Sequence, residues 1–332
     1  MCSEFNLIDR FFVQENVSRD DVDLGIGDDC ALVTVPEGYQ VAITTDTLAA
    51  GTHFLADADP VSVGHKALAS NLSDLAAMGA KPTWVSLALT LPQSDEKWLE
   101  GFCKGFFDLA KQYQVELIGG DTTKGPLSIT ITVQGIIPKG TALTRSAAQI
   151  GDDIYVTGNL GDSAAGLEVI LNSHKNVKGG LEKELEKRHY YSTPQVELAQ
   201  DIRHLCHAAL DISDGVISDL GHILKQSNVS AVINVNNLPI SSELVTYYRQ
   251  DKEKCQKLAL TSGEEYELCF TAPKKNRKAI KQIATILNKK ISIIGEIIDK
   301  PFNGLPDSVQ LFDNNKLLDW QLLGYDHFRR EQ

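Results

Sequence analysis

Hydrophobic and polar positions alternate along the first part of the chain in patterns that predict strands and helices in turn. Residues 41–45 form a short β-branched run, which is typical of a strand. Apolar side chains at helical spacing predict a helix over 60–78, with Pro60 in its first turn and Gly79 at its C-terminal end. A second helix should follow, with Ser94 as its N-cap.

The same mixture of strand-like and helix-like hydrophobic patterns continues to the end of the chain. Residues 129–133 alternate Ile or Val with Thr, which predicts a strand with one covered face. A small, polar stretch near 146–152 suggests a domain boundary, and a helix should begin near Ser163. The charged region 172–188 reads as an exposed connection or helix, and further strands are expected at 154–157, 231–235, 266–271 and 291–298. This order predicts an α/β or α+β architecture with two domains, 1–148 and 149–332.

Composition and charge narrow the class of protein. The 332 residues are 42% hydrophobic and 23% charged, with a formal net charge of −12, which disfavours a nucleic-acid-binding surface. No apolar run approaches the roughly 20 residues that span a bilayer, and the first residues lack a signal-peptide pattern. The six cysteines form no Cys-x-x-Cys pair. We therefore expect a cytoplasmic protein with reduced thiols and no membrane or nucleic-acid partner.

The most informative polar residues are aspartates that stand close to glycine, serine or threonine. They fall at the ends of predicted elements or on a helix face, where carboxylate oxygens stay accessible to a ligand. The seven are Asp28, Asp29, Asp46, Asp74, Asp121, Asp211 and Asp214.

Separated aspartates with threonine hydroxyls suit the binding of a magnesium–nucleotide complex, because Mg²⁺ prefers hard oxygen ligands and takes phosphate and water as the remainder. Taken singly, each aspartate beside glycine is more often a turn or helix-cap residue, at about 70% given that preference. The chain has no P-loop motif and no protein-kinase catalytic set. Residues 158–163 weakly resemble a phosphate loop, but a plain strand-to-helix turn is at least as consistent with them.

In combination, several segments resemble the thiamine-monophosphate kinase family. That family belongs to a superfamily that includes aminoimidazole ribonucleotide synthetase and selenophosphate synthetase. The resemblance covers essentially the whole chain, and it is carried by the stretches GIGDDCA (25–31), TTDTLAAGTHF (44–54), ASNLSDLAAMGA (69–80), LIGGDT (117–122), LTRS (143–146), GDSAAG (161–166), DISDGVISD (211–219) and GYDHF (324–328).

The resemblance implies a fold, a reaction and a set of partners. The fold would be the two-domain aminoimidazole ribonucleotide synthetase-like one, in which the N-terminal half forms a dimeric β-barrel and binds metal and ATP. The C-terminal half would be a layered α/β domain. The reaction would be phosphorylation of thiamine monophosphate to thiamine diphosphate by direct in-line transfer from ATP, with several Mg²⁺ ions, in a homodimer.

The resemblance also implies roles for individual residues. No acid or base catalyst is expected, because a phosphate oxygen is already ionised at neutral pH. Contacts to ATP would come from Gly120, Asp121, Arg145 and Ser213, and contacts to the substrate from His53, Glu264 and Tyr325. Magnesium would be bound by Asp29, Thr44, Thr45, Asp46, Asp74, Asp121, Asp211 and Asp214.

One segment departs from the family pattern, and two other functions stay open. Relatives often read SGGEDYE where this chain reads TSGEEYE at 261–267, so Ser262 stands for glycine and Glu265 for aspartate. A related ATP-dependent synthetase would share the fold and some aspartates. A non-catalytic nucleotide- or thiamine-binding protein would bind both ligands without forming product.

Overall fold

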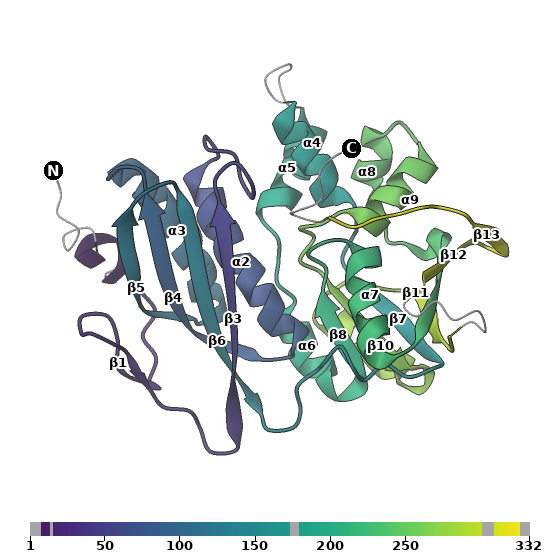
Figure 1. Cartoon of the computed structure of the whole chain (residues 1–332), viewed down its shortest axis with the longest axis horizontal. Helices are drawn as coiled ribbons and strands as arrows, with labels where there is room; N and C mark the ends of the chain where they lie inside the picture. The colour runs from purple at the N-terminus through teal and green to yellow at the C-terminus, as the bar shows by residue number, and fades with distance from the viewer. Residues whose placement is uncertain (1–7, 14–15, 173–178, 301–308, 326–332) are drawn as a thin grey trace. The chain divides into compact units, whose positions relative to one another are not determined.

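The structure is a computed structural model that describes residues 8–13, 16–172, 179–300 and 309–325 (Figure 1). The chain divides into two compact units. The first comprises Met1–Leu75 with Gly79–Ala142, and the second comprises Ala76–Met78 with Leu143–Gln332. Each unit has its own sheet and its own hydrophobic core.

The first unit is built on a mixed four-stranded sheet in the order β3-β6-β4-β5. Its strands are β3 (Tyr39–Ala49), β4 (Lys81–Leu91), β5 (Glu116–Lys124) and β6 (Ser128–Pro138). Only the β4–β5 pair is parallel. A short antiparallel pair, β1 (Val22–Leu24) with β2 (Leu32–Val33), precedes this sheet, and a single helical turn spans Ile8–Val13.

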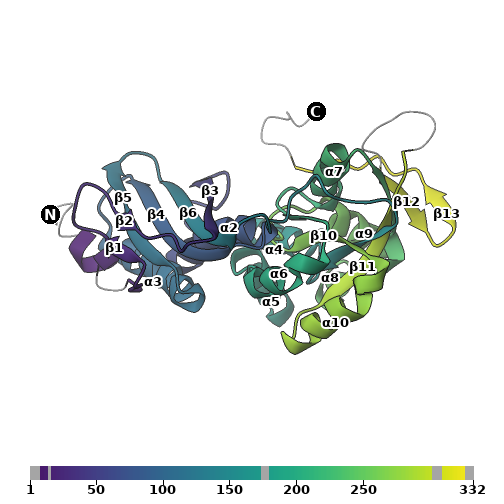
Figure 2. The ribbon, with the colours of Figure 1, turned by 90° about the horizontal axis from the view of Figure 1, so that it is seen from below.

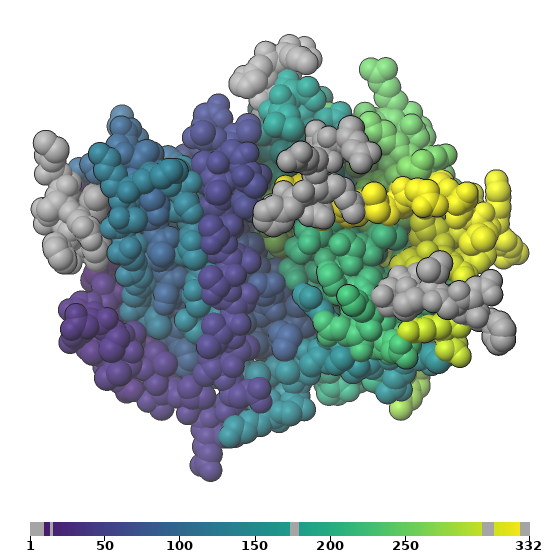
Figure 3. Space-filling view, in the orientation of Figure 1, coloured from purple at the N-terminus to yellow at the C-terminus, as the bar shows by residue number. Residues whose placement is uncertain are grey.

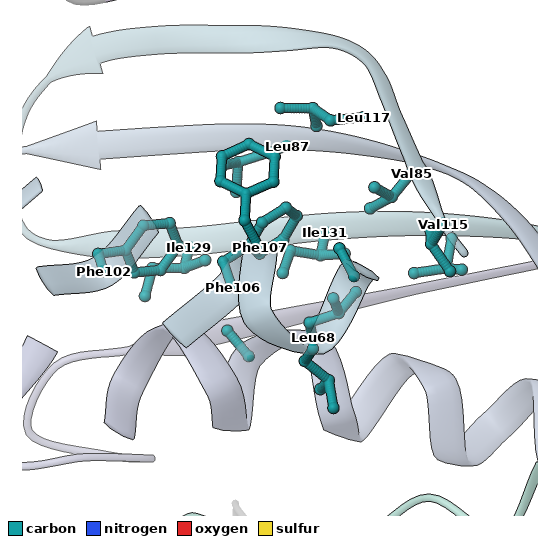
Figure 4. Packing of buried hydrophobic residues seen from close by; sticks show 14 of the residues in the cluster. Leu68, Val85, Leu87, Phe102, Phe106, Phe107, Val115, Leu117, Ile129 and Ile131 are labelled. Atoms are coloured by element: carbon teal, nitrogen blue, oxygen red, sulfur yellow. The ribbon is translucent and has the colours of Figure 1, made fainter. Parts of the chain in front are cut away.

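Two helices, α2 (Pro60–Ala77) and α3 (Glu96–Tyr113), cover one face of this sheet (Figure 1). The aromatic side chains of α3 enter the core, where Phe102, Phe106 and Phe107 lie beside Ile129 and Ile131 of β6 (Figure 4). These β6 residues belong to the apolar set of the alternating pattern, so the pattern predicts the covered face. Burial of this face stabilises the unit through the hydrophobic effect.

The opposite face of the same sheet is exposed within the described part of the unit. Along β3, Ile43, Thr45 and Thr47 are all exposed, and Ile43 keeps 67% of its surface accessible. Figure 3 shows the side chains of β3 at the surface. Among the described residues of the single chain the sheet is open, with β3 and β5 as its edges, and the barrel expected from two copies stays a prediction.

The second unit contains a seven-stranded mixed sheet in the order β13-β12-β9-β11-β7-β10-β8. Helix α7 lies on one face, and α6 and α10 lie on the other (Figure 2). The strands are β7 (Asp152–Thr157), β8 (Ala208–Asp211), β9 (Ser230–Asn234), β10 (Leu268–Pro273), β11 (Ile291–Ile298), β12 (Val309–Asp313) and β13 (Lys316–Leu318). The helices are α4 (Asp162–Leu171), α5 (Gly180–Tyr190), α6 (Val196–Ile202), α7 (Val216–Ser227), α8 (Ser242–Tyr247), α9 (Lys252–Thr261) and α10 (Arg277–Ile286).

Most of the elements expected from the sequence are confirmed, with differences at their ends. The helix expected over 60–78 is α2, and the strand expected over 291–298 is β11 with the same bounds. The expected cap at Ser94 is wrong: Asp95 is the N-cap of α3, and its carboxylate accepts the amides of Lys97 and Trp98. No helix in the described ranges has the length and apolarity that crossing a membrane requires.

Candidate active site

Asp46 and Asp74 form a carboxylate pair on the helix-covered side of the first unit. Asp46 comes from β3 and Asp74 from α2, and the Thr44 hydroxyl donates to Asp74 Oδ2 at 2.5 Å. Burial, together with the smaller effect of the negative charge of Asp74, raises the pKa of Asp46 to about 6. Two acids that oppose each other's ionisation in a half-buried setting favour a bound cation.

The donor atoms around this pair fit Mg²⁺. One helical turn before Asp74 on α2, the buried atom Asn71 Oδ1 has no hydrogen-bond partner among the described residues. Among the described residues, no group of three or more His, Cys, Asp or Glu side chains could hold a metal ion. Two carboxylates and further oxygen atoms match the way Mg²⁺ is usually bound, with phosphate and water as its remaining ligands.

Thr45 and Asp121 lie on the other face of the sheet. Side chains alternate along β3, so Thr45 points away from α2, and its hydroxyl is 2.8 Å from that of Thr132. The strand register puts Asp121 in the same cross-sheet row as the exposed Thr47. Since three strand spacings, roughly 14 Å, separate β3 from β5, the isolated first unit does not bring Asp121 to the Asp46–Asp74 pair.

Two further candidates of the first unit lie in exposed backbone segments. Asp29 follows β1 in the connection to β2, and its amide donates locally to Asp28 Oδ1 at 2.9 Å. Gly120 lies on the edge strand β5, directly before Asp121, with a φ of 156°. A Cβ at Gly120 would lie 1.8 Å from the Leu87 carbonyl oxygen, so the close approach of β5 to β4 at this position requires glycine.

His53 lies in a tight turn that follows β3. Its amide donates to the Ala49 carbonyl at 3.0 Å, and the Gly51 amide donates to the Phe54 carbonyl at 2.8 Å. The ring is also engaged, because the Ala49 amide donates to His53 Nδ1 at 3.1 Å. The buried Lys66 of α2 donates to the His53 carbonyl at 3.0 Å. The His53 side chain therefore stands on a well-defined turn.

In the second unit, the end of β8 and the loop between β8 and α7 carry Asp211, Ser213 and Asp214. Asp211 ends β8 and is buried. Asp219, one turn into α7, accepts the amides of Ser213 and Asp214 on Oδ2, both at 3.0 Å. Burial raises the pKa of the Asp219 carboxyl to about 7. This carboxylate fixes the conformation of the loop from inside the protein.

Backbone hydrogen bonds connect this loop to both of the candidate substrate residues of the second unit. The Glu264 amide donates to the Ser213 carbonyl at 2.7 Å, and the Tyr325 amide donates to the Asp214 carbonyl at 3.0 Å. Gly324 permits the second contact, because a Cβ there would lie 2.8 Å from the Asp214 carbonyl. The structure thus brings Ser213, Asp214, Glu264 and Tyr325 together.

Glu264 is held in an unusual backbone conformation. Its φ is 57°, and that of Tyr266 is 51°, which are uncommon values for residues other than glycine. The Glu264 carboxylate lies 3.7 Å from His189 Nε2. The motif GYDHF supplies Tyr325, whereas its last three residues lie outside the described ranges. Strained backbone of this kind concentrates at functional sites.

Arg145 is remote from this group within the second unit. Its carbonyl accepts the hydroxyl of Ser227, at the C-terminal end of α7, at 2.8 Å. Ser213 and Asp214 precede the N-terminal end of the same helix. Twelve residues of α-helix extend roughly 18 Å, so the described contacts do not bring Arg145 to the Ser213–Asp214 loop.

The phosphate-loop resemblance at 158–163 corresponds to an internal contact. The amide of Gly161 donates to Glu265 Oε1 at 2.7 Å, and the Ser262 hydroxyl donates to the same oxygen at 2.6 Å. The carboxylate of Glu265 therefore occupies the position at which a phosphate loop would bind its ligand. The plain-turn interpretation is the correct one. The same contact joins Ser262 and Glu265, the two residues that depart from the family pattern.

Several residues that shape these loops were not singled out from the sequence. Asp219 lies within the matched stretch 211–219, and Lys66 occupies the apolar stripe of the helix predicted over 60–78. A lysine on such a stripe is a usable signal, because lysine is rarely buried without a specific partner. His189 carries no comparable signal, since it follows the charged residues of 182–188 and belongs to no apolar stripe singled out in the sequence.

Comparisons with known proteins match most of the chain. Residues 27–137 match the model of the AIR synthase related protein N-terminal domain, and residues 149–306 match that of the C-terminal domain. The thiamine-monophosphate kinase of Escherichia coli K12 is 49% identical over 98% of both chains. The crystal structure of the thiamine-monophosphate kinase from Stenotrophomonas maltophilia K279a is 43% identical, with a TM-score of 0.85 over 93% of this chain and 96% of that one. A structure described as AaThiL complexed with AMPPCP and TMP is 29% identical, with a TM-score of 0.76 over 98% and 97% of the two chains.

Proposed function

Because this chain belongs to the thiamine-monophosphate kinase family of the AIR synthase related proteins, we propose that it phosphorylates thiamine monophosphate by direct, magnesium-assisted transfer from ATP. Its activity is that of the family, and the product is thiamine diphosphate. The observation that carries the proposed mechanism is the Asp46–Asp74 pair with Thr44, a set of oxygen donors whose charges favour a cation.

One magnesium site would be built on this pair, and the proposed ligands on the opposite face of the sheet would serve other ions. Asp46, Asp74 and Thr44 would hold a first ion, and the hydrogen bond from Thr44 would also orient Asp74. Bound Mg²⁺ supplies positive charge between two phosphate groups that otherwise repel one another. The further proposed ligands are Asp29, Thr45, Asp121, Asp211 and Asp214.

The other candidate residues would position the two substrates. ATP would contact Gly120, Asp121, Arg145 and Ser213, and thiamine monophosphate would contact His53, Glu264 and Tyr325. The attacking phosphate oxygen is ionised at neutral pH, so the transfer requires no general base and forms no phosphoenzyme. The protein acts through positioning and electrostatics, as in other phosphoryl transfers.

We further propose that two copies pair through the open sheet face of the first unit to form the dimeric barrel. The exposed Ile43 and the location of Thr45 and Asp121 on that face support this proposal, since a second copy would cover them. Light scattering after gel filtration should give the mass of a dimer. Ile43→Arg should give the monomer mass, whereas Ile286→Arg, on the 82%-exposed Ile286 of α10, should leave the dimer intact. A monomeric, fully active wild type contradicts this pairing.

In this proposal residues 1–148 form the dimerisation and metal–ATP domain, and 149–332 form the layered α/β domain. We also propose a cytoplasmic location without nucleic-acid or membrane partners. The net charge of −12 and the free thiols of Cys30, Cys103, Cys206, Cys255 and Cys269 support it.

The deciding experiment is an assay of the purified protein with ATP, Mg²⁺ and thiamine monophosphate, in which thiamine diphosphate is measured. Asp46→Asn should reduce turnover by about two orders of magnitude or more, because the first metal ligand is lost. Asp108→Asn, at an exposed acid that pairs with Lys104, is the matched control and should retain wild-type turnover. Wild-type turnover by Asp46→Asn, or no diphosphate from the wild type, would overturn the proposal.

A further inference from the structure

Lys66 is a fully buried lysine in the first unit. It lies on α2 with 0% of its surface exposed, and its ammonium donates to the carbonyl of His53 at 3.0 Å. Burial of a charged side chain is unfavourable unless specific contacts offset the loss of hydration. A charge-assisted hydrogen bond to a carbonyl is such a contact, and it fixes the backbone of the residue that receives it.

The turn that carries His53 is constrained on both sides of this residue. The His53 amide donates to the Ala49 carbonyl, and its own carbonyl accepts Lys66. Phe54, the next residue, is buried in the core with 6% of its surface exposed. Lys66 thus joins the turn to α2, the helix that also carries Asp74.

The ring of His53 is fixed as well. The Ala49 amide donates to His53 Nδ1 at 3.1 Å. An amide N–H only donates, so Nδ1 must present its lone pair, and the proton of the neutral ring must be on Nε2. Nε2–H is then the atom with which this side chain would donate to an acceptor oxygen of a ligand.

We propose that Lys66 is a positioning residue which, with the Ala49 amide, presents His53 as a neutral Nε2–H donor to a phosphate oxygen of the substrate. This inference rests on the proposed function, in which His53 contacts thiamine monophosphate. A phosphate oxygen is the expected acceptor because His53 follows β3, the strand that carries Thr44 and Asp46. Asp46 and Ala49 are three residues apart, which is about 10 Å along a strand.

The first test replaces Lys66 in the full-length protein. Lys66→Met keeps the length of the side chain and removes the ammonium. The KM for thiamine monophosphate should rise about tenfold, the cost of about one charge-assisted hydrogen bond, while the KM for ATP changes less than twofold. Lys104→Met, at a 63%-exposed lysine of α3 in the same unit, is the matched control and should leave both constants unchanged. An unchanged KM for thiamine monophosphate in Lys66→Met overturns the inference.

A second pair of variants separates the two ring nitrogens. His53→Gln places an amide donor near the position of Nε2, whereas His53→Asn reaches only the position of Nδ1. The glutamine variant should therefore retain a lower KM for thiamine monophosphate than the asparagine variant. The reverse order overturns the inference. Thiamine has no phosphate, so it should inhibit Lys66→Met and the wild type equally well as a competitor. Weaker inhibition of Lys66→Met by thiamine also overturns the inference.

Nitrogen NMR of the wild-type protein tests the inference independently of turnover and of variant folding. The His53 signals, assigned by their absence from His53→Gln, should show a protonated Nε2 and an unprotonated Nδ1. A proton on Nδ1 overturns the inference even in an active enzyme. Failure of the wild type to form thiamine diphosphate overturns the proposed function instead, so the two failures are distinguishable.

Discussion

Thr44 and Asp74 are thirty positions apart in the chain, yet a 2.5 Å hydrogen bond joins the hydroxyl of one to the carboxylate of the other. It links β3 to α2 and orients the acid that faces Asp46. A hydrogen bond to a charged group typically contributes about 1.5–3 kcal/mol. The bond therefore has two roles, in stability and in the orientation of a proposed metal ligand.

Thr44→Val should separate these two roles. The variant keeps the shape of the side chain and removes the donor, so the free energy of unfolding should fall by about 1–2 kcal/mol. The Mg²⁺ concentration for half-maximal activity should rise roughly tenfold, as for the loss of an outer-shell partner. Thr141→Val, at an exposed threonine bonded to the Pro138 carbonyl, is the control and should leave the magnesium dependence unchanged. An unchanged magnesium dependence in Thr44→Val contradicts the role of Thr44.

Glu267 should make the protein less stable as the pH rises towards neutrality. Burial raises the pKa of this carboxyl from 4.5 to about 7. Between these values the folded state binds more protons than the unfolded state, so the free energy of unfolding falls with rising pH. In Glu267→Gln the new side-chain oxygen can still accept the Gln195 amide, but the side chain no longer titrates. The fall in the free energy of unfolding with rising pH should therefore be smaller in this variant, by up to about 3 kcal/mol. Urea unfolding of both proteins at pH 5 and pH 8 measures how their free energies of unfolding change with pH. An equal change in the wild type and in Glu267→Gln would refute the assignment.

Asp21 should have the opposite pH dependence. Its hydrogen bond with Arg19 holds the pKa of its carboxyl below the ordinary 3.8, and the indole of the buried Trp84 donates to it at 3.0 Å. The stabilisation from Asp21 is complete at pH values above its pKa in the unfolded state. It is lost as the pH falls through the lower pKa of Asp21 in the folded state.

Asp21→Asn should therefore cost about 1 kcal/mol at neutral pH and leave the variant less sensitive to acid. Asp23→Asn, at an exposed neighbour bonded to Thr34, should behave as wild type. Tryptophan fluorescence reports the change, because Trp84 contacts Asp21 directly. An acid transition in Asp21→Asn that matches the wild type would contradict this account.

Local structure was predictable from the sequence because its causes are local. The alternation of residues 129–133 identified the covered face of β6, and the helical spacing of 60–78 identified α2. The N-cap was predicted one position early because Ser94 and Asp95 are both good caps, and the carboxylate of Asp95 makes the bonds. The position of the aspartates near glycine, serine or threonine supplied the candidate acids, and the resemblance supplied the other candidate residues and the roles.

Spatial grouping was less predictable, because it depends on strand order and on which face a residue occupies. The strand β8 pairs with β10, and this pairing brings Glu264 to the loop of Ser213 and Asp214. Neither residue type nor spacing in the sequence shows it. Thr45 and Asp121 lie on the face opposite to Asp46, so the sheet divides the metal ligands inferred from the motifs between its two faces.

Asp219 gives a prediction about the loop of Ser213 and Asp214. Its Oδ2 accepts both loop amides while 4% of its surface is exposed, so removal of the carboxylate leaves two donors without their acceptor. Asp219→Ala should destabilise the protein by about 2–4 kcal/mol and raise the KM for ATP. Asp219→Asn keeps an oxygen acceptor in place, so it should retain most of the stability and most of the affinity for ATP. Equal losses in the two variants, measured by urea unfolding and initial rates, would show that the carboxylate charge rather than the acceptor oxygen holds the loop.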